Sequence, residues 1–224
     1  MKKFLRLLGI LLMGITAAVT LLGGIGTTCV ALNPTKYESM KAIASLQWLY
    51  ILYVILGVAL GILGIRATIM LVRGKRNAEK NTLVTLAAGL VVGLIHMATS
   101  RALRGSSMPV DGVVYITALT LIIFLLFRLP RIQAMKLFDR DDKEPDQAGG
   151  LTAIVIGLLV LFVQYWAGPT HIMGGTNYAN AFHNGMSLSG AGVILLGTGM
   201  IASSIPAVRA LITDRIQAAS RNAN

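Results

Sequence analysis

The chain has 224 residues, of which 55% are hydrophobic and only 13% are charged, and its net charge is +11. A soluble domain usually carries about 25% charged residues. This deficit excludes an ordinary water-soluble globular domain and indicates that most of the surface does not face water.

Long stretches without a charged residue follow one another along the chain, at 7–32, 42–65, 81–100, 112–127 and 147–208. A hydrocarbon core of about 30 Å needs about 20 apolar residues in a helix, and backbone groups inside lipid must be hydrogen-bonded internally. The apolar runs do not alternate with polar residues, which excludes a β-barrel. We therefore predict an all-α polytopic integral membrane protein, with one six-helix transmembrane domain over 1–205. The predicted spans are 7–31, 47–72, 82–103, 112–129, 151–168 and 186–205.

The first stretch, MKKFLRLLGILLMGITAA, has the basic start and apolar core of a secretory signal peptide. Its apolar run continues past Gly23 to Leu32, which is longer than a usual signal-peptide core, and no clear A-x-A cleavage site follows. We expect an uncleaved first helix, with a cleaved signal peptide as the alternative.

Basic residues are concentrated in the segments that flank the predicted spans. With six spans, both termini and the second and fourth connections share one side of the membrane. That side carries Lys2, Lys3, Arg6, Arg73, Lys75, Arg76, Lys80, Arg128, Arg131, Lys136, Arg140, Lys143, Arg209, Arg215 and Arg221. The opposite side carries Lys36, Lys41, Arg101 and Arg104.

This charge asymmetry predicts an orientation through the positive-inside rule. Both termini are expected in the cytoplasm, and the membrane is expected to be a plasma membrane, of the bacterial or archaeal inner-membrane kind. The bilayer is the expected partner. Because topology accounts for the basic residues, no nucleic acid partner is expected.

Two segments are predicted to lie on the cytoplasmic side. The segment 130–150 is predicted to be an acidic linker. Its DRDDKEPDQ run does not have the ligand spacing of an EF-hand calcium-binding loop. The segment 206–224 reads as an amphipathic tail lying on the membrane surface, because its apolar residues fall on one helical face.

Glycines recur at the spacing that lets helix backbones approach closely. Packing within the bundle is the first interpretation. Docking of other membrane subunits, or self-association, through these Gly-rich faces is the alternative. The glycines are Gly57, Gly61, Gly64, Gly89, Gly93, Gly190, Gly192, Gly197 and Gly199.

Few side chains offer chemistry inside the spans. No Asp or Glu falls within a predicted span, and the HExxH, GxSxG and Walker A patterns are missing. His96 lies about 22 Å from the inner end of its helix at 1.5 Å per residue, hence in the outer leaflet, and Gln164 lies near the outer end of its own. One interpretation is that His96 and Gln164 are packing residues whose polar groups are hydrogen-bonded between helices. The other is that they form an outward-facing polar pocket with Arg101 and Arg104 at its mouth.

The connection at 169–185 contains the other two histidines, His171 and His183. Together with Cys29, the single cysteine, they could bind a metal such as Cu(I). Their spacing enforces no geometry, and the cofactor, if any, is unknown.

These observations predict a protein without catalytic residues, best interpreted as a small-solute binding or transport component. The first alternative is a non-catalytic accessory subunit of a larger membrane complex. The second is a membrane enzyme or metal-binding protein that uses the outer histidines.

Overall fold

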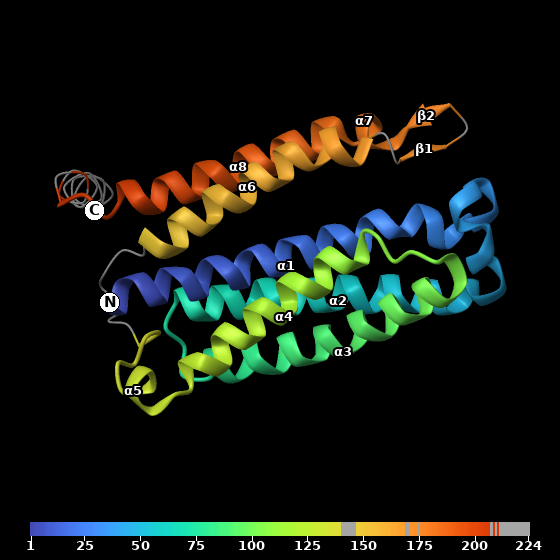
Figure 1. The fold of residues 1–224 in the computed structure, drawn as a ribbon. Helices are drawn as coiled ribbons and strands as arrows, with labels where there is room; N and C mark the ends of the chain where they lie inside the picture. Colours follow the sequence, from blue (N-terminus) through green and yellow to red (C-terminus); the bar gives the residue numbers. More distant parts are fainter. Residues whose placement is uncertain (140–146, 169–170, 174, 207, 209, 211–224) are drawn as a thin grey trace, which may run out of the picture.

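The computed structural model describes residues 1–139, 147–168, 171–173, 175–206, 208 and 210, and the chain is almost entirely helical in these ranges (Figure 1). Within these described ranges, six helices are long and apolar enough to cross a membrane, which confirms that part of the prediction. They are α1 (Lys2–Leu32), α2 (Gln47–Val72), α3 (Ala78–Arg104), α4 (Val110–Phe127), α6 (Gln147–Ala167) and α8 (His183–Ala202).

The helix bounds follow the charge-free runs with one systematic difference. The helix α2 has the predicted limits, whereas α1, α3, α4, α6 and α8 begin two to five residues earlier than predicted. Backbone hydrogen bonding does not stop where apolar residues stop, so a helix can extend through polar residues beyond the hydrocarbon core. Lys2 and Lys3 in α1 and Glu79 and Lys80 in α3 are such residues.

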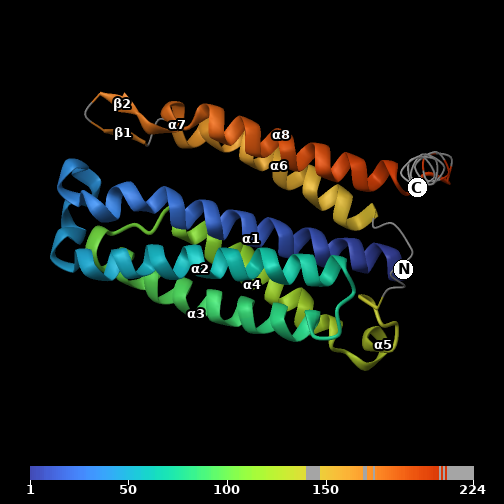
Figure 2. The same cartoon turned by 180° about the vertical axis from the view of Figure 1, so that it is seen from behind.

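The helices are arranged around α1, which packs against α2, α4 and α6. The helix α3 packs against α2 and α4, and α8 packs against α6. Figures 1 and 2 show the α6–α8 pair on one side of α1, and α3 on the opposite side. Helices α1–α4 therefore form a four-helix group to which the α6–α8 pair is added.

Glycines bring several of these helices into backbone contact. A Cβ atom added at Gly61 of α2 would lie 2.7 Å from the Leu21 Cα atom of α1. In the α6–α8 pair, a Cβ atom added at Gly197 would lie 2.5 Å from the Gly150 carbonyl oxygen. These small residues are thus used for packing within the chain, because any larger side chain would hold the helices apart.

Shorter elements connect the long helices. The turn between α1 and α2 contains the 3₁₀ helices η1 (Pro34–Lys36) and η2 (Glu38–Leu46). After α6 come the two-residue strands β1 (Ile172–Met173) and β2 (Thr176–Asn177), which pair antiparallel with Met173 opposite Thr176, and then α7 (Tyr178–Ala181).

The segment predicted as a linker is partly helical. It includes α5 (Pro130–Gln133), which begins at a proline as helices often do, and the first turn of α6. Its acidic part at 140–146, and nearly all of the predicted amphipathic tail at 206–224, lie outside the described residues.

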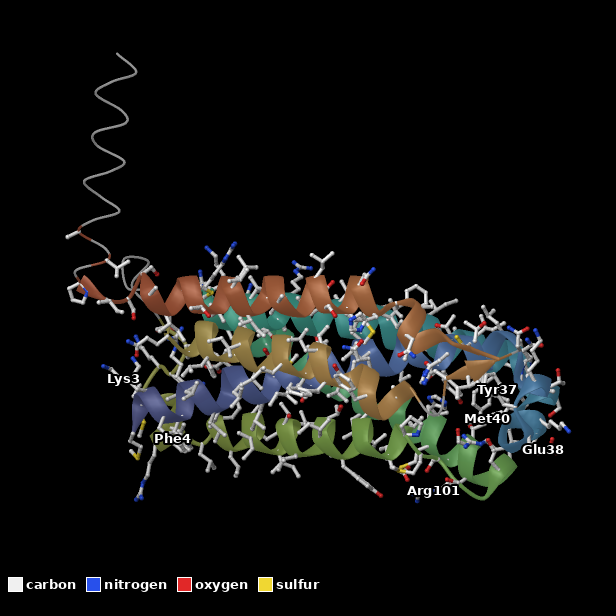
Figure 3. All side chains as sticks on the ribbon, turned by 90° about the horizontal axis from the view of Figure 1, so that it is seen from above. Lys3, Phe4, Tyr37, Glu38, Met40 and Arg101 are labelled. Carbon is white, nitrogen blue, oxygen red and sulfur yellow. The ribbon has the colours of Figure 1, made fainter. Side chains whose placement is uncertain are left out.

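The bundle has two different ends. Figure 3 shows Lys3 and Phe4 at one end and Tyr37, Glu38 and Arg101 at the other. We call the first the basic end, where α1 begins and α2 turns into α3, and the second the polar end, where η1, η2 and the α3–α4 turn lie. The start of α1 and the last turn of α8 share the basic end (Figure 1).

Buried hydrophobic side chains form a cluster towards each end. The cluster towards the basic end contains Ile10, Leu71, Phe124, Phe127 and Phe138 among others. The cluster towards the polar end consists of Ala31, Ile43, Tyr50 and Tyr53. The polar-end cluster is the smaller, and two of its four members carry hydroxyl groups.

Candidate functional site

An aromatic group lies between α2 and α3 near the polar end. The His96 ring of α3 is stacked on the Tyr53 ring of α2, with centroids 4.3 Å apart and planes 18° apart. The Tyr50 ring meets the His96 ring edge-on at 5.3 Å and the Tyr53 ring edge-on at 5.7 Å. The three rings share one level because α2 and α3 are antiparallel, so that the start of α2 meets the end of α3.

Both tyrosine hydroxyls in this group have partners on α3. The Tyr50 hydroxyl is hydrogen-bonded to the Ser100 hydroxyl at 2.8 Å, and the Tyr53 hydroxyl to the Thr99 hydroxyl at 3.1 Å. Among the described residues, in contrast, His96 makes ring contacts and no hydrogen bond. Polar groups inside proteins are normally hydrogen-bonded, so the half-buried imidazole has donor and acceptor capacity that the tyrosines do not use.

Arg101, at the last turn of α3, is already neutralised by its neighbours. Its guanidinium group donates to the Ser107 hydroxyl at 2.9 Å and to the Tyr115 hydroxyl at 3.4 Å, and lies 3.5 Å from the Asp111 carboxylate. Ser107 in turn donates a short hydrogen bond to Asp111. Arg101 therefore connects the end of α3 to the start of α4 through hydrogen bonds and an ion pair.

Arg104, three residues later, has a different environment. Its Nε atom donates to the Ser39 carbonyl oxygen of η2 at 3.2 Å, and no carboxylate pairs with it in the part of the chain that the structure describes. It is half-buried, and a helical side chain covers the turn that precedes its own Cα atom. Arg104 thus supplies a positive charge at the end of α3, eight residues and about 12 Å along the helix axis from His96.

The side-chain amide of Gln164 has hydrogen-bond partners away from His96. It is 7% exposed, its amide nitrogen donates to the Leu161 carbonyl oxygen at 2.9 Å, and its amide oxygen lies 2.7 Å from His183 Nδ1. Because α6 and α3 lie on opposite sides of α1 (Figure 1), the structure does not bring Gln164 together with His96. The hydrogen bond to His183 instead links the end of α6 to the start of α8.

The three predicted metal ligands are not gathered either. The His171 ring lies 2.7 Å from the Ala167 carbonyl oxygen through Nδ1 and 3.3 Å from the Gly26 carbonyl oxygen through Nε2, and Cys29 is a half-buried free thiol on α1. Over the described ranges, no group of three or more His, Cys, Asp or Glu side chains is arranged to hold a metal ion. A metal site at His171, His183 and Cys29 stays a prediction.

Sequence reasoning missed one charged residue inside a span. Arg66 lies within α2, between Ile65 and Ala67, six residues before the helix ends at Val72. The signal was present in the sequence, since the span 47–72 was predicted with these limits and contains this single charge.

Comparison of the chain with protein-family models, with curated proteins and with solved structures finds no match in any of the three.

Proposed function

We propose that the chain is an integral membrane protein that binds a small polar or anionic solute at the polar end of α3, as a binding or transport component. We call the residues concerned the His96 site: Tyr50, Tyr53, His96 and Arg104. No covalent chemistry is assigned to this site. Its role is recognition, through an imidazole and a guanidinium group held at fixed positions.

One observation supports this proposal above the others. Both tyrosine hydroxyls beside His96 are hydrogen-bonded to α3, which holds their rings, whereas the imidazole nitrogens have no partner among the described residues. The imidazole nitrogens are not among the buried side-chain atoms without a partner in the described ranges, so a water molecule or a solute can reach them. The charge of Arg104 favours a solute with negative charge.

The proposed orientation places the His96 site on the outer side. The described cations at the basic end include Lys2, Lys3, Arg73, Lys75, Arg76 and Arg128. By the positive-inside rule, the basic end with the start of α1 is cytoplasmic, and the polar end faces outward.

A second function is favoured by one feature of α8. Among its glycines, Gly192 and Gly199 have open space where a Cβ atom would be, and Leu188 and Leu195 are 76% and 72% exposed. We propose, as the second candidate, that this face packs on another membrane subunit. Stoichiometric co-purification of another chain, lost on Gly192→Leu substitution, tests it.

The solute-binding proposal is tested by thermal unfolding of the purified chain in neutral lipid nanodiscs. Acetate, oxalate, phosphate and glycine serve as probes, because a ligand that binds the native state raises the melting temperature. We expect at least one probe to stabilise the wild type, and His96→Ala and Arg104→Gln to abolish the shift.

Lys36→Gln is the matched control, since it removes an exposed cation at the same end. It should leave the shift intact. A shift that persists in both His96→Ala and Arg104→Gln would overturn the proposal.

A further inference from the structure

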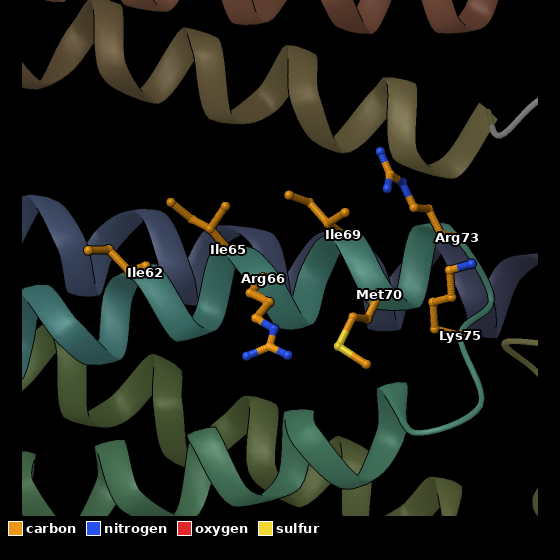
Figure 4. Close-up of a pocket in the computed structure, with 7 residues that line it drawn as sticks. All are labelled: Ile62, Ile65, Arg66, Ile69, Met70, Arg73 and Lys75. Carbon is orange, nitrogen blue, oxygen red and sulfur yellow. The ribbon is translucent and has the colours of Figure 1, made fainter.

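A groove with a volume of about 390 Å³ lies along α2 near the basic end. Its apolar wall is formed by Ile62, Ile65, Ile69 and Met70, and its cations are Arg66, Arg73 and Lys75. Figure 4 shows Arg66 extending towards α3 and Arg73 towards α6, so the two guanidinium groups diverge from the same helix. We call these seven residues the Arg66 groove.

The spacing along α2 places apolar and cationic groups side by side. Arg66 and Arg73 are seven residues apart, which is two helical turns and about 10 Å along the axis. Ile62 and Ile69 have the same spacing, and they are 57% and 45% exposed. An apolar stripe two helical turns long thus runs beside Arg66 and Arg73 on the exposed face of α2.

Arg66 lies deeper in the membrane than the other two cations. It precedes the last residue of α2 by six positions, which corresponds to about 9 Å. An ionisable side chain at such a depth is costly and marks a functional site by default. Its long side chain can reach towards the membrane surface, where lipid phosphate groups lie.

The cations of the groove have no acidic partners in the ranges that the structure describes. Neither Arg66 nor Arg73 nor Lys75 forms an ion pair or a side-chain hydrogen bond there. Glu79, the nearest carboxylate along the chain, interacts electrostatically with Arg128. The groove is therefore positively charged, and a guanidinium group matches a phosphate through two parallel hydrogen bonds.

We propose that the Arg66 groove binds one anionic glycerophospholipid. The lipid phosphate, which carries the negative charge, pairs with Arg66, the deepest of the three cations. Arg73 and Lys75 lie towards the rest of the headgroup, near the end of α2, and an acyl chain lies along Ile62, Ile65 and Ile69. A zwitterionic lipid is disfavoured because the groove offers no carboxylate to its ammonium group. Basic pockets at the cytoplasmic ends of membrane helices are suited to such headgroups. This site is independent of the His96 site.

The test is native mass spectrometry of the full chain in mild detergent. The probes are phosphatidylglycerol, phosphatidylcholine with the same acyl chains, and inorganic phosphate. We expect one phosphatidylglycerol to bind per chain, more tightly than phosphatidylcholine, and inorganic phosphate alone not to bind. We expect Arg66→Gln to weaken phosphatidylglycerol binding about fivefold, the effect of one cation near the membrane surface.

Arg76→Gln is the matched control, because Arg76 is an exposed cation in the same turn and does not line the groove. It should leave binding unchanged. Arg73 lies beyond the end of α2, so Arg73→Gln serves as a second variant in case Arg66→Gln does not fold. We expect it also to weaken binding of phosphatidylglycerol. Equal binding of both lipids, binding unaffected by the groove substitutions, or an equal loss in Arg76→Gln would overturn the proposal.

Discussion

The imidazole ring of His96 lies flat on the phenol ring of Tyr53, with the ring centroids 4.3 Å apart. The stack joins the start of α2 to the end of α3, and the Tyr53 hydroxyl extends it by a hydrogen bond to Thr99. The position of His96 is thereby fixed by contacts that leave its nitrogen atoms unused among the described residues. That combination of a fixed ring and unused nitrogens is what a binding site requires.

Substitutions of Tyr53 separate its ring from its hydroxyl. Tyr53→Phe removes one hydrogen bond and keeps the ring, so the free energy of unfolding should fall by about 1 kcal/mol. Tyr53→Ala also removes the stack and leaves a cavity, with an expected loss of about 3 kcal/mol or more. Reversible unfolding in detergent measures both. Equal losses would show that the ring stack contributes nothing.

Two glycine substitutions test the backbone contact between α1 and α2. Gly61→Ala places a Cβ atom 2.7 Å from Leu21 Cα and 2.9 Å from Leu21 N, so the helices must separate. We expect a loss of about 1–3 kcal/mol in the free energy of unfolding, typical of overpacking.

Gly192→Ala is the control, because nothing lies within 4 Å of its added Cβ atom. Alanine is favoured over glycine in a helix by about 1 kcal/mol, so this variant should be neutral or slightly more stable. A stability loss equal to that of Gly61→Ala would argue against the described α1–α2 contact.

The Gln164–His183 hydrogen bond is expected to be structural. A double-mutant cycle with Gln164→Leu and His183→Phe should give a coupling energy of about 0.6 kcal/mol, the average for hydrogen bonds between membrane helices, and at most about 1.7 kcal/mol. Probe binding at the His96 site should be unaffected by either substitution. Additive effects on stability would indicate that the 2.7 Å contact makes no net contribution.

The sequence predicts how deep each residue lies along its helix, but it does not predict which helices are adjacent. The charge-free runs locate all six long helices, and alternating helix directions place His96 and Gln164 towards the same end of the bundle, because depth depends only on residue number along each helix. Which helices are adjacent depends on three-dimensional packing. For that reason depth alone groups Gln164 with His96, whereas α6 packs against α8 on the other side of α1.

The sequence also does not predict the hydrogen-bond and ion-pair partners of individual side chains. Arg101 and Arg104 are three residues apart, and nothing in the sequence distinguishes their roles. In the structure Arg101 is paired with Asp111, whereas Arg104 donates to a carbonyl oxygen of η2. The distinction arises from the α3–α4 turn, which returns Ser107 and Asp111 to Arg101.

Thiol labelling from outside the cell tests whether the His96 site faces outward. The chain has one cysteine, so Cys29→Ser gives a cysteine-free background into which His96→Cys and, at the basic end, Lys75→Cys are introduced. We predict that a membrane-impermeant thiol reagent labels the His96→Cys protein in intact cells and the Lys75→Cys protein only after permeabilisation. A folded His96→Cys protein that is labelled only after permeabilisation, or not at all, would contradict an outward-facing binding site.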